Sequence, residues 1–276
     1  MRIEFFGVRG TRPVARRRGS VYGGHTPCAL VRDGAGEILI LDAGTGLHRL
    51  EESLPVRANK EGNRPHLLLT HFHFDHLSGL PFLETLFRRS ALIRFYSLFP
   101  PAVLRRRLSG FMTGPYFPIE FSETPSRKEF LRIGPRPRRI GRLAVSSCPL
   151  NHPQGCAAYR LEENGLSIVF ATDTEHYARG VDARLAAFAL GTDVLIYDGM
   201  FTPAEYEAGK KGWGHSTWAA GVELARAAGA RRLVLSHLNP EHSDADVERL
   251  ESAARRAFPG AVCAREGMII RLEKRP

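Results

Sequence analysis

The sequence lacks the features that mark membrane proteins and disulfide-bonded proteins. It holds no apolar run of about 18 residues or more, so we expect no membrane-spanning helix and no membrane partner. The first residues run directly into a strand-like segment and lack the long apolar stretch and small-residue cleavage site of a signal peptide. The four cysteines are scattered and form no CxxC pair, which favours free thiols in a reducing compartment. We therefore expect a cytoplasmic protein.

Lysine is also scarce, because only five of the 39 basic residues are lysines. The net charge of +10 is matched by the segment 88–142 alone, which holds thirteen Lys and Arg against three Glu. Arg16, Arg17 and Arg18 form a second basic cluster in a Gly- and Pro-rich loop. Such clusters attract phosphate groups and nucleic acids, although arginine-rich coding would produce the same excess without a function. Both interpretations stay open.

Apolar segments and helical patterns alternate along the chain. Strand-like runs lie at 1–8, 66–71, 143–152, 193–199, 231–237 and 261–272, with hairpins at 29–44 and across Asn164-Gly165. Helical spacing recurs at 47–53, 77–90, 181–191, 216–230 and 244–258, whereas Pro and Gly interrupt 100–142. The chain has 276 residues, 43% of them hydrophobic, and no visible repeat or linker. We therefore expect one α/β domain over 1–276, with a basic insertion at about 88–142.

The segment 70–79, THFHFDHLSG, concentrates metal-binding side chains. It follows an apolar run and places four donors close together: His71, His73, Asp75 and His76. Buried together, such groups are costly unless they are paired or bound to a cation. Imidazole and carboxylate donors suit Zn²⁺, Mn²⁺ or Fe²⁺. The motif therefore predicts a metal centre, and one loop of this kind can serve two neighbouring ions.

Three more donor residues each follow an apolar run. His152 ends the segment 143–152, Asp173 follows LSIVFAT, and His237 ends the segment 231–237. A single histidine of this kind is more often structural than a ligand. Three of them, in one chain with the segment 70–79, form a specific pattern, so we expect these side chains to meet around the metal centre.

The order HxHxDH, then His, Asp and His at strand ends, resembles the metallo-β-lactamase superfamily over essentially the whole chain. The resemblance implies a four-layer αββα sandwich with the site at one edge. It also implies two divalent ions, one held by His71, His73 and His152 and the other by Asp75, His76 and His237. Asp173 would bridge the ions, and Asp75 would also take part in catalysis. A hydroxide between two such ions is a ready nucleophile, because cations lower the pKa of bound water.

Residues 213–237 narrow the branch of the family. Their Gly-His-Ser-Thr motif resembles that of ribonuclease Z and related phosphodiesterases, in which this loop contributes a histidine to the site. The resemblance makes His215 a general acid that protonates the leaving oxygen or contacts phosphoryl oxygens, and it places Ser216 at the substrate. The segment 195–201 would supply Asp198, which orients and charges His215. The alternative is that His215 only caps the following helix.

The N-terminal motifs FFGVRGTRP, YGGHTPCALV and LILDAGTG resemble a bacterial group of small phosphodiesterases with this fold. His25 stands where Asn is common in that group, so it either lines the substrate pocket or hydrogen-bonds a loop. Asp42 would hold the metal-binding loop through hydrogen bonds, or would only occupy a turn before Gly.

The basic segment 88–142 differs from the long Gly- and Pro-rich arm with which ribonuclease Z grips tRNA. Its arginines stand among aromatic residues such as Phe99, Phe111 and Tyr116. This composition suits base stacking beside phosphate contacts, a lid over the site, or a dimer interface. A nucleic-acid partner and a homodimer are therefore both compatible with the sequence.

Together these features predict a metal-dependent hydrolase. The leading hypothesis is a phosphodiesterase that acts on a cyclic nucleotide, a small phosphodiester or an RNA end. The alternatives are a ribonuclease Z-like nuclease for tRNA 3′ ends and an ester hydrolase of the lactonase or thioesterase type, because the same centre serves these reactions. A binding protein without activity would not be expected to keep the whole donor set. We expect Zn²⁺, with Mn²⁺ or Fe²⁺ as alternatives.

Overall fold

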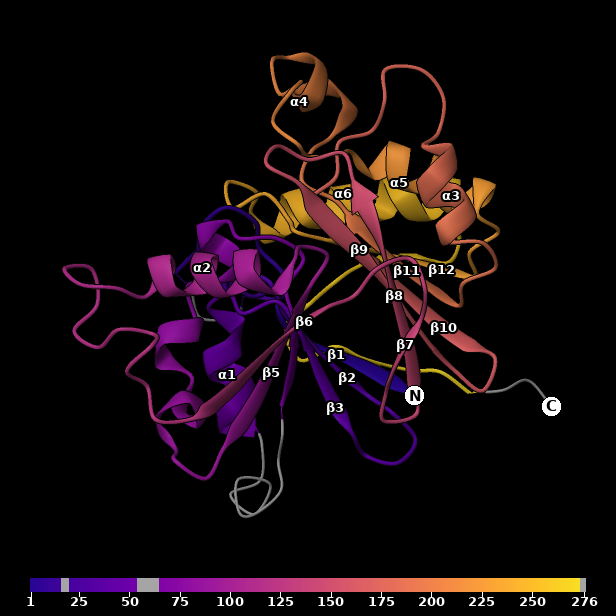
Figure 1. Ribbon diagram of the computed structural model, residues 1–276. Helices are drawn as coiled ribbons and strands as arrows, with labels where there is room; N and C mark the ends of the chain where they lie inside the picture. Colours follow the sequence, from indigo (N-terminus) through magenta and orange to yellow (C-terminus); the bar gives the residue numbers. More distant parts are fainter. Residues whose placement is uncertain (16–19, 54–64, 274–276) are drawn as a thin grey trace.

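The computed structural model describes residues 1–15, 20–53 and 65–273. In this part of the chain, two seven-stranded sheets pack face to face, and helices lie on their outer sides (Figure 1). The second basic cluster, Arg16 to Arg18, lies outside the described residues. No described helix is long and apolar enough to cross a membrane.

The first sheet has the strand order β14-β1-β2-β3-β4-β5-β6. Its strands are β1 (Arg2–Gly7), β2 (Cys28–Arg32), β3 (Ile38–Leu41), β4 (His66–Leu68), β5 (Leu92–Ser97), β6 (Arg127–Arg132) and β14 (Ile269–Arg271). Successive side chains of a strand point to opposite faces. Leu39 and Leu68 therefore join the core between the sheets. Ile40 and Leu67 face a second core under α1 (Gly46–Ser53) and α2 (Pro101–Phe111).

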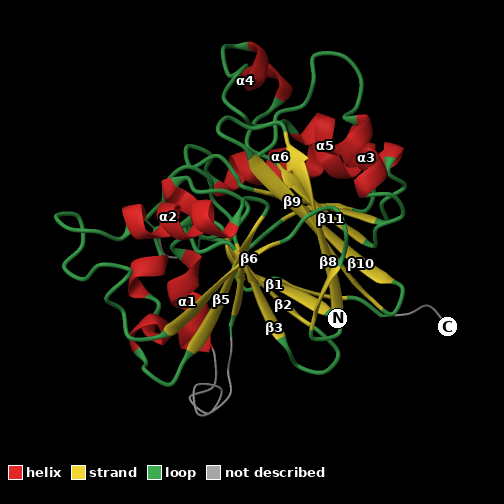
Figure 2. Cartoon of the chain, in the orientation of Figure 1, coloured by secondary structure: helices red, strands yellow, loops and turns green. Residues whose placement is uncertain are grey.

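The second sheet has the order β13-β12-β11-β10-β9-β8-β7. Its strands are β7 (Arg138–Ile140), β8 (Leu143–Leu150), β9 (Cys156–Glu163), β10 (Leu166–Ala171), β11 (Val194–Asp198), β12 (Arg232–Ser236) and β13 (Ala261–Cys263). Three helices cover its outer face: α3 (Ala183–Phe188), α5 (Trp218–Ala227) and α6 (Asp244–Ala257). The short helix α4 (Pro203–Glu207) stands beyond them at the top of Figure 2. These layers confirm the expected αββα sandwich.

Strand direction explains why the predicted donors gather at one edge. The strands β10, β11 and β12 are mutually parallel, and β8 runs the same way because β8 and β10 are both antiparallel to β9. The carboxyl ends of β8, β10, β11 and β12 therefore lie at the same edge of the second sheet. The residues that follow these ends include His152, Asp173 and His237, and Asp198 is the last residue of β11.

Two expectations from the sequence were wrong in their local structure. Residues 77–90 do not form one helix; short 3₁₀ helices span Leu80–Phe82 and Glu84–Phe87. Leu83 interrupts them with an extended conformation (φ −68°, ψ 103°), and Pro81 has no N–H to continue an α-helical ladder. The segment 100–142 is more regular than expected, since it contains α2, β6 and β7. Much of the basic segment 88–142 thus belongs to the two sheets and to α2.

Candidate metal centre

The histidine-rich loop after β4 lies at the edge of the first sheet. The carboxylate of Asp42 accepts hydrogen bonds from the Thr70 backbone N–H at 2.8 Å and from the Thr70 hydroxyl at 2.9 Å. These bonds fix the start of the loop. The 3₁₀ helix η2 (Phe74–His76) then places the ring of His76 against that of His71, with the ring centroids 4.2 Å apart. Both rings are buried, with exposed fractions of 0% and 1%.

The first group of donors joins this loop to the end of β8. It contains His71, His73 and His152, and one nitrogen of each ring lies within 4.8 Å of the others. His152 Nε2 lies 3.2 Å from His73 Nδ1. This is the set of side chains that the resemblance assigns to one ion.

The second group joins the loop to the end of β12. Its donors are Asp75, His76 and His237, again within 4.8 Å of one another. His237 Nε2 lies 3.3 Å from His76 Nε2 and 3.2 Å from Asp75 Oδ2. The backbone N–H of Thr11 donates to Asp75 Oδ2 at 2.8 Å, which ties the N-terminal loop to the same carboxylate.

Asp173 lies between the two groups. Its Oδ1 is 3.1 Å from His237 Nε2 and 3.8 Å from His71 Nε2, and its Oδ2 is 3.3 Å from His76 Nε2. Asp173 and His237 both adopt left-handed backbone conformations, with φ of 61° and 58°. Such conformations are uncommon outside glycine and tend to cluster at functional sites. The carboxylate is placed to contact both groups at once.

The outer ring nitrogens of three of these histidines face acceptors that set their tautomers. His76 Nδ1 faces Asp42 Oδ2 at 2.8 Å, and His152 Nδ1 faces the Gly214 carbonyl at 2.8 Å. His73 Nε2 faces Gln154 Oε1 at 3.0 Å. A proton held on the outer nitrogen leaves a lone pair on the inner one. This arrangement is typical of metal-ligating histidines.

The inner atoms fit a bound cation. Two nitrogens that bind one tetrahedral zinc ion at about 2.0 to 2.1 Å lie roughly 3.3 to 3.4 Å apart. The pairs His73–His152 and His76–His237 have nitrogen separations of 3.2 and 3.3 Å. His71 Nε2 and Asp173 Oδ2 are buried without a hydrogen-bond partner, a costly state that a metal bond would relieve. The donor set therefore suits divalent metal ions.

Burial and charge prepare several of these groups for ligation. Burial lowers the pKa of His71 and of His152, which keeps both rings neutral with a free lone pair. Burial alone would raise the pKa of Asp75, but His76 and His237 lower it well below its usual value. The carboxylate is therefore ionised.

His215 lies beside these groups and is paired with Asp198. Its Nδ1 is 2.9 Å from Asp198 Oδ2, and its ring stacks on that of His237 with centroids 4.8 Å apart. Burial alone would lower the pKa of His215, but the charge and hydrogen bond of Asp198 raise it to about 9. Asp198 is fully buried and also accepts from the backbone N–H groups of Asp173 and Met200. A charged imidazole is thus held next to the donor groups by a fixed carboxylate.

The chain matches the Beta-lactamase superfamily domain over residues 38–238, which is most of its length. The chain belongs to the metallo-β-lactamase superfamily. A similar curated protein is Ribonuclease Z from Methanosarcina acetivorans, which is 27% identical over 327 residues that cover 100% of this chain and 99% of the relative.

Two solved structures with 18% sequence identity share the fold of this superfamily member. Zn²⁺-bound PqqB from Methylobacterium extorquens has a TM-score of 0.74, and the match covers 99% of this chain and 100% of that chain. The short form of human tRNase Z has a TM-score of 0.69, with 99% of this chain and 100% of that chain matched. Two of these similar proteins, Ribonuclease Z and the short form of human tRNase Z, carry names from the group that the motif at residues 213–237 resembles.

Two residues expected at the substrate have other contacts in this superfamily member. Ser216 is fully buried, and its hydroxyl lies 3.1 Å from the Tyr197 hydroxyl and 3.0 Å from His176 Nδ1. These contacts favour a role in holding the His215 loop. His25 Nδ1 lies 3.2 Å from Thr45 Oγ1, which corresponds to the loop-bonding alternative.

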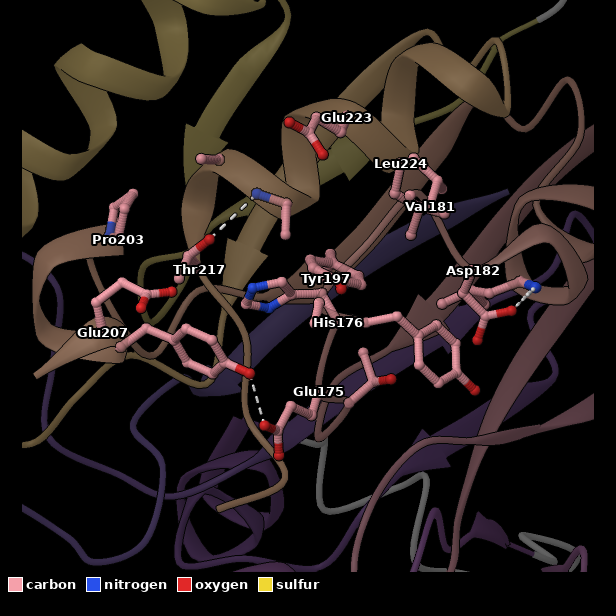
Figure 3. Close-up of a pocket in the computed structure, with 18 residues that line it drawn as sticks. Glu175, His176, Val181, Asp182, Tyr197, Pro203, Glu207, Thr217, Glu223 and Leu224 are labelled. Atoms are coloured by element: carbon pink, nitrogen blue, oxygen red, sulfur yellow. Dashed lines mark hydrogen bonds between the residues drawn. The ribbon is translucent and has the colours of Figure 1, made fainter. Parts of the chain in front are cut away.

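Sequence reasoning missed several residues that support the donors. Gln154, with φ of 60°, reaches His73, and Glu175 hydrogen-bonds the loop that carries His215. Both lie in loops without a recognisable motif, and only their position two residues after His152 and Asp173 hinted at a role. Beside the His215 loop lies a cavity of about 380 Å³, whose lining includes Glu175, His176 and Glu207 (Figure 3).

Proposed function

We propose that this metallo-β-lactamase superfamily member is a metal-dependent phosphodiesterase. Its substrate class is a cyclic nucleotide, a small phosphodiester or an RNA end. The observation that carries the proposal is the pair of His215 and Asp198, at 2.9 Å, beside the two donor groups. A protonated imidazole next to a dinuclear site suits an anionic group whose leaving oxygen needs a proton.

His71, His73 and His152 would hold one divalent ion, and Asp75, His76 and His237 the other, with Asp173 between them. Zn²⁺ is the ion we propose, because imidazole and carboxylate donors at these separations suit it. Two such ions, when bound, lower the pKa of a bound water and neutralise charge on the phosphoryl oxygens.

The protein's own part in the reaction is proton delivery. His215 gives its Nε2 proton to the leaving oxygen as the bond from phosphorus to that oxygen breaks. A water supplies the oxygen of the new bond to phosphorus, and the proton that this water loses restores the charged ring. Asp198 accepts from Nδ1 of His215 and keeps the ring charged and correctly turned. Such general acid catalysis contributes about 10²- to 10⁴-fold to the rate.

The test compares two phosphodiesters that differ in their leaving group. Bis-p-nitrophenyl phosphate releases a stable phenolate, whereas a dinucleotide releases an alkoxide that needs a proton. With Zn²⁺ or Mn²⁺ added, His215→Ala should lower kcat about 100-fold or more for the dinucleotide and much less for bis-p-nitrophenyl phosphate. Metal-independent turnover would contradict the proposal, as would faster cleavage of lactones or thioesters than of either phosphodiester.

A ribonuclease Z-like nuclease for tRNA 3′ ends is the second candidate. It is supported by the similarity to Ribonuclease Z and by the three exposed arginines of α2, Arg105, Arg106 and Arg107. Binding of precursor tRNA that weakens steeply with salt, followed by cleavage at the 3′ side, would favour this candidate over a small-molecule phosphodiesterase.

A further inference from the structure

Glu175 lies in the loop after β10 and hydrogen-bonds the loop that carries His215. Its Oε1 accepts from the Gly212 backbone N–H at 2.7 Å, and its Oε2 accepts from the Gly214 backbone N–H at 2.8 Å. The Tyr206 hydroxyl also donates to Oε1 at 2.6 Å, and Figure 3 shows this bond as a dashed line. One carboxylate therefore satisfies three donors from the segment 206–214.

Gly214 connects Glu175 to a proposed metal ligand. Its N–H donates to Glu175, and its carbonyl accepts from His152 Nδ1 at 2.8 Å. The backbone φ of Gly214 is 83°, and a Cβ at this position would lie 2.3 Å from His152 Nδ1. The Gly214 Cα therefore lies against the His152 ring, and the Gly214 carbonyl holds the outer nitrogen of that ring.

The backbone of Glu175 is fixed to the same region from the other side. Its N–H donates to the Asn151 carbonyl at 2.7 Å, and the Asn151 side-chain amide donates back to the Glu175 carbonyl at 2.9 Å. Asn151 immediately precedes His152. Glu175 therefore contacts the backbone before His152 and, through Gly214, the outer nitrogen of the His152 ring.

We propose that Glu175 is a positioning residue for the metal centre, acting through the Gly214 carbonyl on His152 and therefore on only one of the two donor groups. The second group receives its support elsewhere, since Asp42 accepts from His76 and Thr11 donates to Asp75. The inference rests on the proposed ligand role of His152. It predicts an asymmetric effect, which a general loss of stability would not produce.

The experiment measures the affinity for each of two metal ions. The purified protein is loaded with Co²⁺, whose visible absorption reports the ligand geometry, and the ions are removed by titration with a chelator. His152→Ala and His237→Ala identify which ion each step reports. Glu175→Ala should lower the affinity for the ion assigned to His152 by about 10- to 100-fold and change the absorption spectrum of that ion. The affinity for the other ion should change less than about twofold. Glu175→Gln, which keeps one acceptor oxygen, should have an intermediate effect.

Glu207→Ala is the matched control. Glu207 lines the same cavity and carries the same charge, but its carboxylate pairs with Lys211 at 2.6 Å. It should leave both affinities unchanged. The proposal is overturned if Glu175→Gln and Glu175→Ala leave the affinity for the ion at His152 unchanged. It is also overturned if they lower the affinities for both ions equally. If His152→Ala itself changes neither ion, the ligand assignment fails, which is a separate result from the failure of Glu175.

Discussion

The Nδ1 atom of His215 lies 2.9 Å from Oδ2 of Asp198, and the backbone N–H groups of Asp173 and Met200 hold this carboxylate. Asp198→Asn replaces the negatively charged acceptor by a neutral amide, which stabilises a charged imidazole less well. We expect kcat for a dinucleotide to fall about 100-fold, with a smaller change in KM. Asp193→Asn, just before β11, is the control and should keep kcat. An unchanged kcat in Asp198→Asn would remove the general acid from the mechanism.

Asp42 supports the other donor group. Its Oδ2 accepts from His76 Nδ1 at 2.8 Å, and its φ of 60° is a conformation that Asn also tolerates. The Asp42→Asn variant should therefore fold. Its affinity for the metal ion at His76, measured by chelator titration, should fall by about 10- to 100-fold. Asp33→Asn, a buried aspartate that caps the turn before β3, should not affect metal affinity. Equal metal loss in both variants would count against a specific role for Asp42.

Glycine is required at position 214 for two separable reasons. Gly212 and Gly214 share a φ of 83°, but a Cβ at Gly212 would meet nothing within 4 Å, whereas at Gly214 it would lie 2.3 Å from His152 Nδ1. Both Ala substitutions should cost about 1 kcal/mol or more of unfolding free energy from backbone strain. Only Gly214→Ala should also displace His152 and lower metal affinity, measured by the same titration. A similar metal loss in Gly212→Ala would show that strain, not contact, is responsible.

Glu51 on α1 is expected to make stability depend on pH. Burial raises its pKa to about 7, and the nearby Glu84 carboxylate adds to this, while backbone N–H groups and Arg88 oppose it. The pKa of an unfolded glutamate is about 4.3, so the folded protein holds the proton more tightly. The protonated Glu51 side chain therefore contributes its full stabilisation of the folded state below about pH 4.3. This contribution is lost as the pH rises through about 7.

The variant Glu51→Gln mimics the protonated side chain and isolates this effect. After allowance for solvent screening, it should be more stable than the wild type by about 1 to 2 kcal/mol near pH 8 and nearly equal below about pH 4. Denaturant unfolding at several pH values of the metal-free protein measures the difference. A difference that does not change with pH would contradict the assignment to Glu51.

The arginines of α2 test the nucleic-acid hypothesis. Arg105, Arg106 and Arg107 are all exposed. Replacing the three with Ala should weaken binding of single-stranded RNA and reduce the slope of log affinity against log salt by about 2, since each phosphate contact contributes about 0.7.

Three exposed arginines on α6 provide the matched control for this experiment. Arg249, Arg255 and Arg256 carry the same total charge at another place on the surface. Their replacement by Ala should leave the salt slope unchanged. If both triple variants lose the same affinity, the binding depends on net charge and not on α2.

Regular strands and their turns were predictable from the sequence because local chemistry determines them. Asn164 and Gly165 have φ of 53° and 81°, the conformation that this pair favours in a two-residue hairpin. The helix α2 was obscured because Pro100 and Pro101 read as loop residues, although proline suits the first turn of a helix. The helix expected at 77–90 was wrong because apolar spacing does not distinguish an α-helix from consecutive 3₁₀ turns.

The donor residues were recognisable because histidines and aspartates followed apolar runs. The structure brings His152, Asp173 and His237 to the loop after β4, as the sequence predicted. The supporting residues were not recognisable in the same way. Glu175 acts through the backbone of Gly214, and this contact joins positions 39 residues apart that share no motif. Such pairs depend on how loops pack, which spacing along one strand does not reveal.

The donors cross the boundary between the two sheets, since the loop 71–76 follows β4 of one sheet and His237 follows β12 of the other. Neither sheet alone carries all of the proposed ligands. A slip of one layer against the other would alter every separation that spans them, such as the 3.3 Å between His76 and His237. The affinity for metal should therefore fall when the two sheets shift relative to one another. Cavity-forming changes deep in the central core, far from any histidine, should release ions before they unfold the chain.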